Sequence, residues 1–404
     1  MICEDSFLSN RRSRVWPSTS VDNCLGIFGI SVYNKCTFMA SKKLRSVELF
    51  TGAGGLAMGL ELAGFEHCAA IEWDHDSCET IRENQRQNFP LVKNWNIHEC
   101  DVRNFDYSTI QEDIDLVAGG PPCQPFSLAG KHKGFDDSRD MWSEAVRSTR
   151  ELNPRAFIFE NVKGLLRHAF DTYFAYILLQ LSFPSVARKK NEDWITHSRR
   201  LEKLEKNGSK VEYRVKFKLL NAADYGVPQK RERVVIVGFR SDLNVTWDFP
   251  TPTHSHRHIT VNDAISDLPN ISSTRPTSKT PNHSFQKGAR FYKGHTGSRL
   301  DESAKTLKAG AHGVPGGENM IDNNDGTCRY FSVREAARLQ CFPDGYIFPG
   351  SWSASMRQLG NAVPVLLAKV LGQSVANALR DNSIDDKKGT PILTYGKHRE
   401  LQSA

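Results

Sequence analysis

One cysteine of this chain lies between prolines, in the stretch Gly-Gly-Pro-Pro-Cys-Gln-Pro-Phe-Ser that covers residues 119–127. The apolar run 114–118 precedes it and predicts a buried parallel strand, which the glycines and prolines end in a stiff turn. Because strand ends of α/β sheets present reactive groups, Cys123 is a candidate nucleophile. Taken alone, the same cysteine is interpreted equally well as an inert loop thiol.

A glycine-rich turn, Thr-Gly-Ala-Gly-Gly-Leu-Ala at 51–57, follows a predicted strand at 46–50 and opens a helical pattern that Gly64 closes. Glycines at such a turn let the backbone approach a ligand closely. Gly52 and Gly54 therefore indicate a cofactor-binding turn. The pattern also matches the dinucleotide fingerprint, so an NAD site and a plain tight turn both stay open.

Acidic residues follow the next two predicted strands. Glu72 and Trp73 end the strand 68–71, where a carboxylate can accept hydrogen bonds from a ribose and an indole can stack on adenine. Asp101 lies at the end of a third short strand. In the alternative interpretation, Trp73 only packs and Glu72 caps the helix that follows it.

A fifth predicted strand, 155–159, ends in Glu160. A carboxylate in that position tends to be desolvated, which suits acid–base chemistry. The alternative is a solvated Glu160 beside a helix-capping Asn161. Further along, Arg231 and Arg233 enter another strand two residues apart, so we expect both to point to the same side.

These side chains need a scaffold that brings strand ends together. The alternation of strand and helix patterns predicts an α/β fold with a parallel sheet. Successive strand ends then gather the glycine turn, the carboxylates and the cysteine at one edge, and this convergence is a stronger signal than any single residue. An apolar helix at 365–379 is amphipathic enough to pack on the same sheet.

Amino-acid composition changes along the chain and divides it into regions. Pro, Ser, Thr, His, Asn and Gly dominate a loop-rich segment that we expect to form a second, smaller domain. Six aromatic residues would supply its core: Trp247, Phe285, Phe291, Tyr292, Tyr330 and Phe331. The expected divisions are a poorly ordered extension at 1–43, a catalytic domain at 44–243, the loop-rich domain at 244–332, a C-terminal part returning to the catalytic domain at 333–380, and a polar tail at 381–404.

Two segments leave the pattern. Residues 1–38 show no period and precede Met39, which is therefore a candidate start of translation. Between residues 188 and 218, eleven Lys or Arg stand against five Asp or Glu. We interpret this segment as a solvated helix face or insertion, with a phosphate-facing patch as the alternative.

Composition narrows the class of protein. The chain has 404 residues, a formal net charge of +7 and a pI of about 8.9, which gives mild support for a polyanionic partner. No apolar run reaches the roughly 20 residues of a membrane span, and the N-terminus lacks a signal-peptide pattern. Nine cysteines without a Cys-x-x-Cys pair indicate reduced cytosolic thiols and no metal site.

Five motifs stand in the order in which one family has them. They are FTGAGG at 50–55, PPCQPFS at 121–127, ENV at 160–162, QKRER at 229–233 and GNAVP at 360–364. With these motifs the chain resembles the DNA cytosine-5 methyltransferases over residues 46–379. It departs after Asp137-Ser-Arg139, where Asp140-Met-Trp142 replaces the Gly and Leu-Phe that the family commonly has.

The resemblance implies a Rossmann-like methyltransferase domain, a target-recognition domain at 244–332, and S-adenosyl-L-methionine as the methyl donor. It assigns nine residues to the donor pocket: Phe50, Gly52, Gly54, Glu72, Trp73, Asp101, Val102, Pro121 and Asn361. It further implies double-stranded DNA as substrate, a monomer in the bacterial cytoplasm, no membrane association, and functional pairing with a restriction endonuclease.

The implied chemistry uses four residues. Cys123 would add to C6 of a flipped-out cytosine, because cytosine C5 is otherwise too weak a nucleophile to take a sulfonium methyl group. Glu160 would hold or deliver a proton at N3, Arg233 would contact O2, and Arg231 would orient the loop and favour the thiolate. The segment 124–139 would close over the base.

Three other functions compete with this one. An RNA cytosine methyltransferase of the same fold is disfavoured by the long variable segment. An NAD-dependent dehydrogenase leaves Cys123, Glu160 and Arg233 without a role, and an intact nucleophile and carboxylate argue against a silent DNA-binding module.

Overall fold

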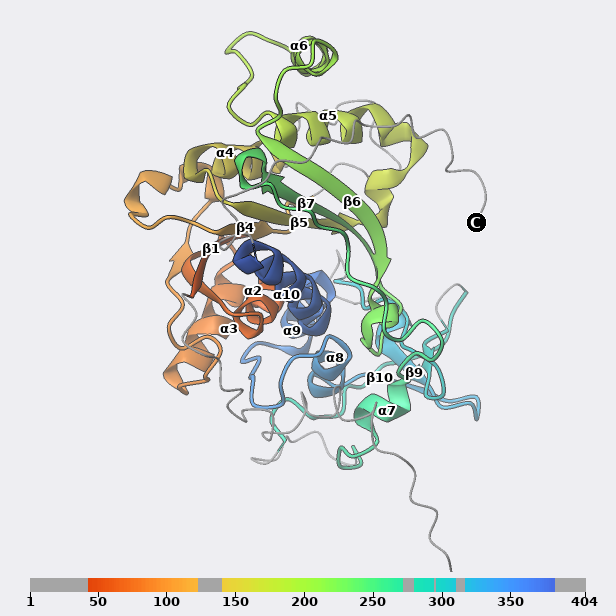
Figure 1. The fold of residues 1–404 in the computed structure, drawn as a ribbon. Helices are drawn as coiled ribbons and strands as arrows, with labels where there is room; N and C mark the ends of the chain where they lie inside the picture. Colours follow the sequence, from red (N-terminus) through yellow and green to blue (C-terminus); the bar gives the residue numbers. More distant parts are fainter. Residues whose placement is uncertain (1–42, 123–139, 272–279, 294–295, 310–316, 382–404) are drawn as a thin grey trace, which may run out of the picture.

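The computed structural model describes residues 43–122, 140–271, 280–293, 296–309 and 317–381. A seven-stranded sheet lies at its centre, in the order β3-β2-β1-β4-β5-β7-β6 (Figure 1). Neighbouring strands from β3 to β5 are parallel, whereas β7 is antiparallel to both β5 and β6. The strands are β1 (Leu44–Leu49), β2 (Phe65–Glu72), β3 (Ile97–Glu99), β4 (Leu116–Gly119), β5 (Ala156–Val162), β6 (Tyr213–Asn221) and β7 (Glu232–Arg240).

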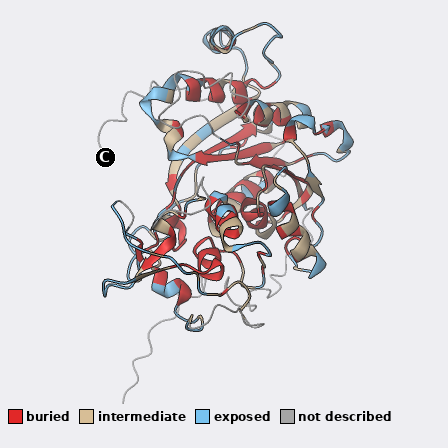
Figure 2. Ribbon diagram, turned by 180° about the vertical axis from the view of Figure 1, so that it is seen from behind, coloured by how far each residue is buried: buried red, intermediate tan, exposed pale blue. Residues whose placement is uncertain are grey.

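Helices cover both faces of this sheet, and Figure 2 shows its central strands buried. The helices α2 (Gly55–Leu62), α3 (His75–Arg86) and α10 (Val365–Asp381) lie on one side, and α4 (Trp142–Leu152) and α5 (Asp171–Ser182) on the other (Figure 1). Side chains alternate between two apolar cores, because a strand points successive residues to opposite faces. The predicted α/β class with a parallel-rich sheet is confirmed.

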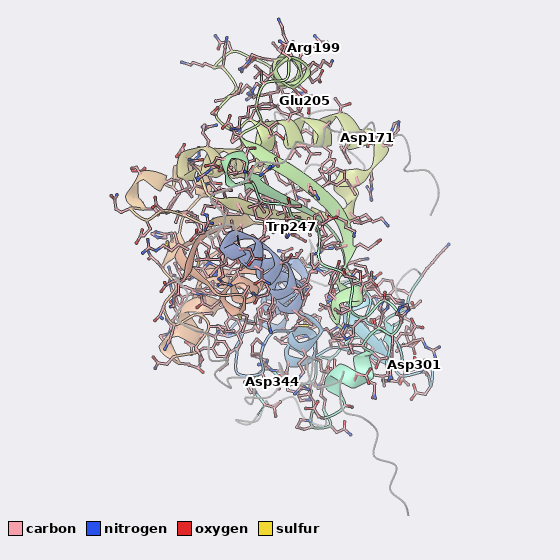
Figure 3. All side chains as sticks on the ribbon, in the orientation of Figure 1. Asp171, Arg199, Glu205, Trp247, Asp301 and Asp344 are labelled. Atoms are coloured by element: carbon pink, nitrogen blue, oxygen red, sulfur yellow. The ribbon has the colours of Figure 1, made fainter. Side chains whose placement is uncertain are left out.

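The C-terminal helix packs closely on the helix that follows the glycine turn. A Cβ atom added at Gly59 of α2 would lie 2.3 Å from the Cβ of Ala368 in α10, so only glycine fits this contact. Nearby, the indole Nε1 of Trp247 donates to Ser374 Oγ at 2.8 Å, which ties the segment after β7 to α10 (Figure 3). The expected packing of this helix against the first domain is therefore observed.

The region after β7 contains little regular structure among its described residues. It holds α7 (Val261–Ile265) and a small sheet of β8 (Ser298–Arg299), β9 (Met320–Asp322) and β10 (Cys328–Tyr330). The helices α8 (Val333–Leu339) and α9 (Trp352–Asn361) then lead back towards the main sheet (Figure 1). Elements this short explain why the sequence of the region is irregular. The proposed domain boundaries remain predictions.

The expectation that six aromatic residues form the core of this region is correct for three of them and wrong for the other three. Trp247, Tyr330 and Phe331 are buried. The other three, Phe285, Phe291 and Tyr292, are between 37% and 44% exposed, so they do not serve as core.

The charged segment is partly helix and partly strand. Helix α6 (Trp194–Lys206) stands away from the main sheet, and Arg199 and Glu205 project outwards from it (Figure 3). Its buried Leu201 packs with Tyr176 and Phe183 in a small separate cluster. This agrees with a solvated helix, but the end of the segment forms strand β6, whose outward lysines masked its strand pattern.

One helical stretch is long and apolar enough to span a membrane, although the sequence indicates no such run. Residues 352–381 contain a window with a mean hydropathy of 1.4. However, 61% of that window is buried inside the protein, and residues 362–364 interrupt the stretch between α9 and α10. Its apolar side chains belong to the core that packs against α2.

Candidate active site

The turn between β1 and α2 adopts an unusual backbone conformation. Phe50 has a φ of 57°, and Gly52 and Gly54 have φ values of 54° and 88°. Residues with side chains rarely adopt such angles, and outliers of this kind cluster at ligand-binding sites. A Cβ added at Gly52 would meet no atom within 4 Å, so the space beside this residue is open. At Gly54 it would lie 2.8 Å from the ring of Trp95.

Glu72 joins this turn to the end of β2. Its Oε2 accepts a hydrogen bond from the backbone N–H of Gly52 at 2.7 Å, and its Oε1 accepts from the N–H groups of Trp73 and Asp74 at 2.9 and 2.8 Å. Burial raises the pKa of Glu72 from its ordinary value, against the effect of these donors. Asp74, rather than Glu72, caps α3 by accepting from Ser77 N–H.

Trp73 and Asp101 lie at neighbouring strand ends but have different surroundings. Trp73 is 73% exposed, so it is not a packing residue. The Asp101 carboxylate accepts hydrogen bonds from the backbone and guanidinium of Arg103, and this side-chain contact lowers the pKa of Asp101. Val102 beside it is buried in the core.

The turn after α9 closes over the glycine turn. A Cβ added at Gly55 would lie only 2.4 Å from the carbonyl oxygen of Val363, so the two turns are in contact. Asn361 is exposed at this place. The GNAVP motif begins 305 residues after the FTGAGG motif ends. The structure nevertheless brings it to the same edge of the sheet as Gly52 and Glu72.

The ends of β4 and β5 are held together immediately before the cysteine. Asn161 Nδ2 donates to the carbonyl oxygen of Pro121 at 2.9 Å, so Asn161 does not act as a helix cap. A Cβ added at Gly120 would lie 3.3 Å from Glu160 Oε2. Cys123 and the expected closing segment 124–139 lie outside the described residues.

Glu160 forms an ion pair with Arg233. Arg233 Nε lies 2.5 Å from Glu160 Oε1, and both side chains are 11% exposed. Antiparallel pairing of β5 with β7 sets Val162 opposite Arg233. Glu160 lies two residues before Val162, so its side chain is on the same face of the sheet and reaches Arg233. The solvated Glu160 of the alternative interpretation is therefore wrong.

Arg231 is buried and points to the same side of the chain as Arg233, as predicted, with the exposed Glu232 between them. Its guanidinium donates to the carbonyl oxygens of Leu307, Gly360 and Ala362 at 3.2, 2.7 and 2.9 Å. These contacts join β7, the loop-rich region and the turn that carries Asn361. The described geometry therefore favours a positioning role for Arg231.

Sequence reasoning missed Glu48 because it stands within an apolar strand. Glu48 is 1% exposed and lies two residues before Phe50. A charged residue inside a buried strand is itself a signal of function, since buried carboxylates are rare without a partner.

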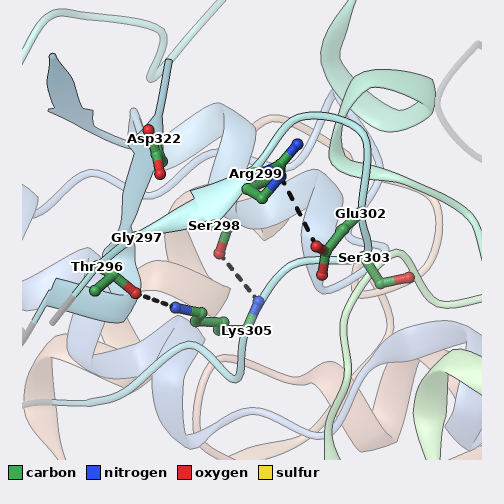
Figure 4. A pocket seen from close by; sticks show the side chains of 8 residues that line it. All are labelled: Thr296, Gly297, Ser298, Arg299, Glu302, Ser303, Lys305 and Asp322. Atoms are coloured by element: carbon green, nitrogen blue, oxygen red, sulfur yellow. Dashed lines mark hydrogen bonds and ion pairs between the residues drawn. The ribbon is translucent and has the colours of Figure 1, made fainter. Parts of the chain in front are cut away.

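A polar cavity of about 180 Å³ lies away from this edge, in the loop-rich region (Figure 4). In it, Lys305 Nζ donates to Thr296 Oγ1, and Ser298 Oγ accepts from the backbone N–H of Lys305. The cavity has no cysteine, and none of the nine predicted donor-pocket residues lines it. Ala304, between two of its lining residues, forms an isolated β-bridge with Gln229 just before β7.

The fold and the edge described above define an α/β enzyme with a cofactor turn next to a buried carboxylate–arginine pair. The chain belongs to the C-5 cytosine-specific DNA methylase family, whose model matches residues 44–183 and 187–377. It is therefore a DNA (cytosine-5-)-methyltransferase.

Curated relatives match most of the chain. It is 34% identical over 379 residues to the Type II methyltransferase M.PspPI of Psychrobacter sp., covering 85% of this chain and 82% of the relative. It is also 34% identical over 347 residues to the Type II methyltransferase M.NgoMIV of Neisseria gonorrhoeae, covering 83% of this chain and 98% of the relative.

Solved structures share the fold at lower identity. A putative DNA modification methyltransferase encoded within an Escherichia coli prophage has a TM-score of 0.62 at 23% identity, over 84% of this chain and 100% of that one. A mutant DNMT2 of Spodoptera frugiperda has a TM-score of 0.55 at 17% identity, over the same shares of the two chains. These likenesses concern the fold alone.

Proposed function

We propose that S-adenosylmethionine binds at the edge formed by the ends of β1 and β2 and the turn after α9. The residues present fit such a cofactor. The space beside Gly52 is open. Trp73 exposes a flat ring close by, because the backbone N–H groups of Gly52 and Trp73 both donate to the carboxylate of Glu72. Six further residues would line the pocket: Phe50, Gly54, Asp101, Val102, Pro121 and Asn361. When bound, the cofactor supplies an electrophilic methyl group on a sulfonium.

The reaction would proceed through a covalent adduct. The Cys123 thiolate adds to C6 of cytosine while Glu160 places a proton on N3, which turns C5 into an enamine carbon. C5 would then take the methyl group, and a base would remove the proton from C5 as Cys123 leaves from C6. N3 would return its proton to Glu160, which restores the neutral aromatic ring.

The observation that carries this proposal is the Glu160–Arg233 pair beside the PPCQ motif. Gly120 and Pro121 contact Glu160 and Asn161, so the described residues that precede the cysteine in this motif lie next to this pair. Arg233 can turn from Glu160 to cytosine O2 when the base enters. Glu160 is then free to hold a proton at N3 of the cytosine.

The target atom lies inside stacked DNA, so the cytosine must be flipped out of a duplex. We propose that residues 244–332 read the surrounding sequence, because base edges are recognised by side chains in the grooves. The Type II relatives further support a role as the modification half of a restriction–modification system, with a cognate endonuclease as functional partner.

The direct test is methyl transfer from labelled S-adenosylmethionine to duplex DNA and, in parallel, to bulk tRNA. We expect label in DNA only, and bisulfite sequencing of DNA from an expressing host should place it at cytosines within one short sequence. Transfer to tRNA alone would contradict the DNA assignment. An absence of transfer to both would contradict the proposed activity.

A further inference from the structure

Glu48 is a buried carboxylic acid that no step above uses. Its carboxyl accepts a hydrogen bond from the backbone N–H of Ala57, and its Oε2 has no hydrogen-bond partner among the described residues. Nearly all buried polar atoms have a partner, so an orphaned carboxyl oxygen requires an explanation.

This carboxyl lies directly beneath the glycine turn. Ala57 belongs to the first turn of α2, immediately after that glycine turn. Its carbonyl oxygen also interacts with His67 Nε2 at 2.9 Å, and His67 Nδ1 lies 3.0 Å from Ser46 Oγ. Glu48 of β1 and His67 of β2 therefore both contact the backbone of Ala57 at the start of α2. Of these two side chains, Glu48 is the acidic one.

The charges around Glu48 favour its neutral form in the free protein. Burial raises the pKa of Glu48 well above its ordinary value, and the nearby carboxylate of Glu72 from β2 adds to this effect. The first turn of α2 carries no acidic residue, and burial lowers the pKa of His67 to about 4, so this ring is neutral. Among the described residues, neither Glu48 nor Glu72 forms an ion pair with Lys or Arg.

We propose that Glu48 is a positioning residue of the cofactor turn that releases a proton to solvent when a cationic cofactor binds above it. The inference rests on the proposed binding of S-adenosylmethionine, whose sulfonium and ammonium groups are positive. A nearby cation favours the ionised carboxyl, and by linkage the ionised carboxyl favours the cation.

This coupling distinguishes substrate from product. S-adenosylhomocysteine lacks the sulfonium charge, so it should drive less ionisation of Glu48. After methyl transfer Glu48 takes up a proton again, and the product is held less tightly than the substrate.

Isothermal titration calorimetry of the full chain tests this proposal at pH 7.5. Titration in two buffers of different ionisation enthalpy gives the number of protons released per cofactor bound. We expect wild type to release a measurable fraction of a proton with S-adenosylmethionine and less with S-adenosylhomocysteine. Its affinity for S-adenosylmethionine should tighten from pH 6 to pH 9.

The Glu48→Gln variant keeps an acceptor for Ala57 N–H but cannot titrate. It should release less than half as many protons, show a flat pH profile, and bind S-adenosylmethionine severalfold more weakly with little change for the product. Glu61→Gln is the matched control. Glu61 also lies on α2, and burial raises its pKa to about 7, but its carboxylate accepts from Trp95 Nε1 instead.

Equal proton release by wild type and Glu48→Gln would overturn the proposal and point to Glu72 or to the cofactor's own amino group. Equal release with both cofactors in wild type would overturn it as well, and this comparison needs no variant to fold. If wild type bound neither cofactor, the proposed donor site itself would fail.

Discussion

At the scale of single residues, the carboxyl that we propose to serve N3, that of Glu160, is held in an ion pair with Arg233. Arg233 Nε lies 2.5 Å from Glu160 Oε1 in a largely buried place. Solvent screens an ion pair little in so buried a place, so an entering base would have to compete for both side chains. In the proposed reaction cytosine would offer O2 to Arg233 and N3 to Glu160, which would account for the pairing of the two side chains.

We expect Glu160→Gln to lower the rate of methyl transfer more than it lowers DNA affinity. Glutamine keeps the size of the side chain but cannot bind and return a proton on the same terms, and general acid–base groups typically contribute about 10²–10⁴-fold. Single-turnover kinetics measure the chemical step, and a filter or anisotropy assay measures binding. An unchanged single-turnover rate would show that the proton role is wrong.

At the scale of elements, Arg231 is where three parts of the chain meet. Its guanidinium holds the carbonyl oxygens of Leu307, Gly360 and Ala362. The start of β7, the loop-rich region and the Asn361 turn are thereby fixed to one another. Burial lowers the pKa of Arg231 well below its ordinary value, because it disfavours the charged guanidinium. The three carbonyl oxygens are the hydrogen-bond acceptors that face this charge.

Arg231→Lys should lower the free energy of unfolding by roughly 2–4 kcal/mol, because a lysine cannot satisfy three buried carbonyls with the planar geometry of arginine. Cofactor affinity should fall as well, since the Asn361 turn loses its anchor. Urea denaturation measures the first effect and calorimetry the second.

Lys230→Ala is the control for Arg231→Lys. Its ammonium makes an exposed ion pair with Glu302, and such pairs contribute about 0–1 kcal/mol. If both variants were equally stable, the described contacts of Arg231 would not have the positioning role that we assign to them.

The sequence predicted the elements that have a clear period and missed those that do not. The strands β2 and β5 and the helix α10 follow from their apolar patterns. Strand β6 was hidden because Lys216 and Lys218 on its outward side resemble a solvated segment. Strands of two or three residues, such as β8, are too short to have a period at all.

The site divides in the same way. Motifs and strand ends indicated Glu160 and Arg233, but only tertiary pairing of β5 with β7 brings the two into contact. Glu48 was missed although an acidic residue within an apolar strand is a signal, because the sequence alone does not show that its carboxyl is buried without a partner. Its burial and its orphaned oxygen arise from packing beneath α2.

At the scale of the whole molecule, the loop-rich region is tied to the catalytic sheet. The backbone N–H of Lys230 donates to the carbonyl oxygen of Ala304, and the N–H of Ala304 donates to that of Pro228. Trp247 donates to Ser374 on α10. These contacts join the region that we propose for target recognition to the catalytic sheet. We expect this segment to vary only where the contacts are kept.

We expect that replacing the segment 244–332 with its counterpart from a related enzyme transfers the target sequence, provided that the residues equivalent to Trp247 and 302–308 are retained. Base-edge contacts specify sequence, whereas phosphate contacts only position the protein. Bisulfite sequencing of host DNA measures the outcome. A folded chimera that still modified the original sites would place specificity elsewhere in the chain.

The central claim is that this chain methylates cytosine C5 through a covalent bond from Cys123. The most direct measurement compares wild type with Cys123→Ser by quantifying 5-methylcytosine in duplex DNA after incubation with S-adenosylmethionine. The variant should fold, bind the methyl donor and yield less than about a hundredth of the wild-type product, because loss of a nucleophile usually costs several orders of magnitude. Substantial 5-methylcytosine formed by Cys123→Ser, or methylation by wild type at an exocyclic nitrogen instead of C5, would contradict the account.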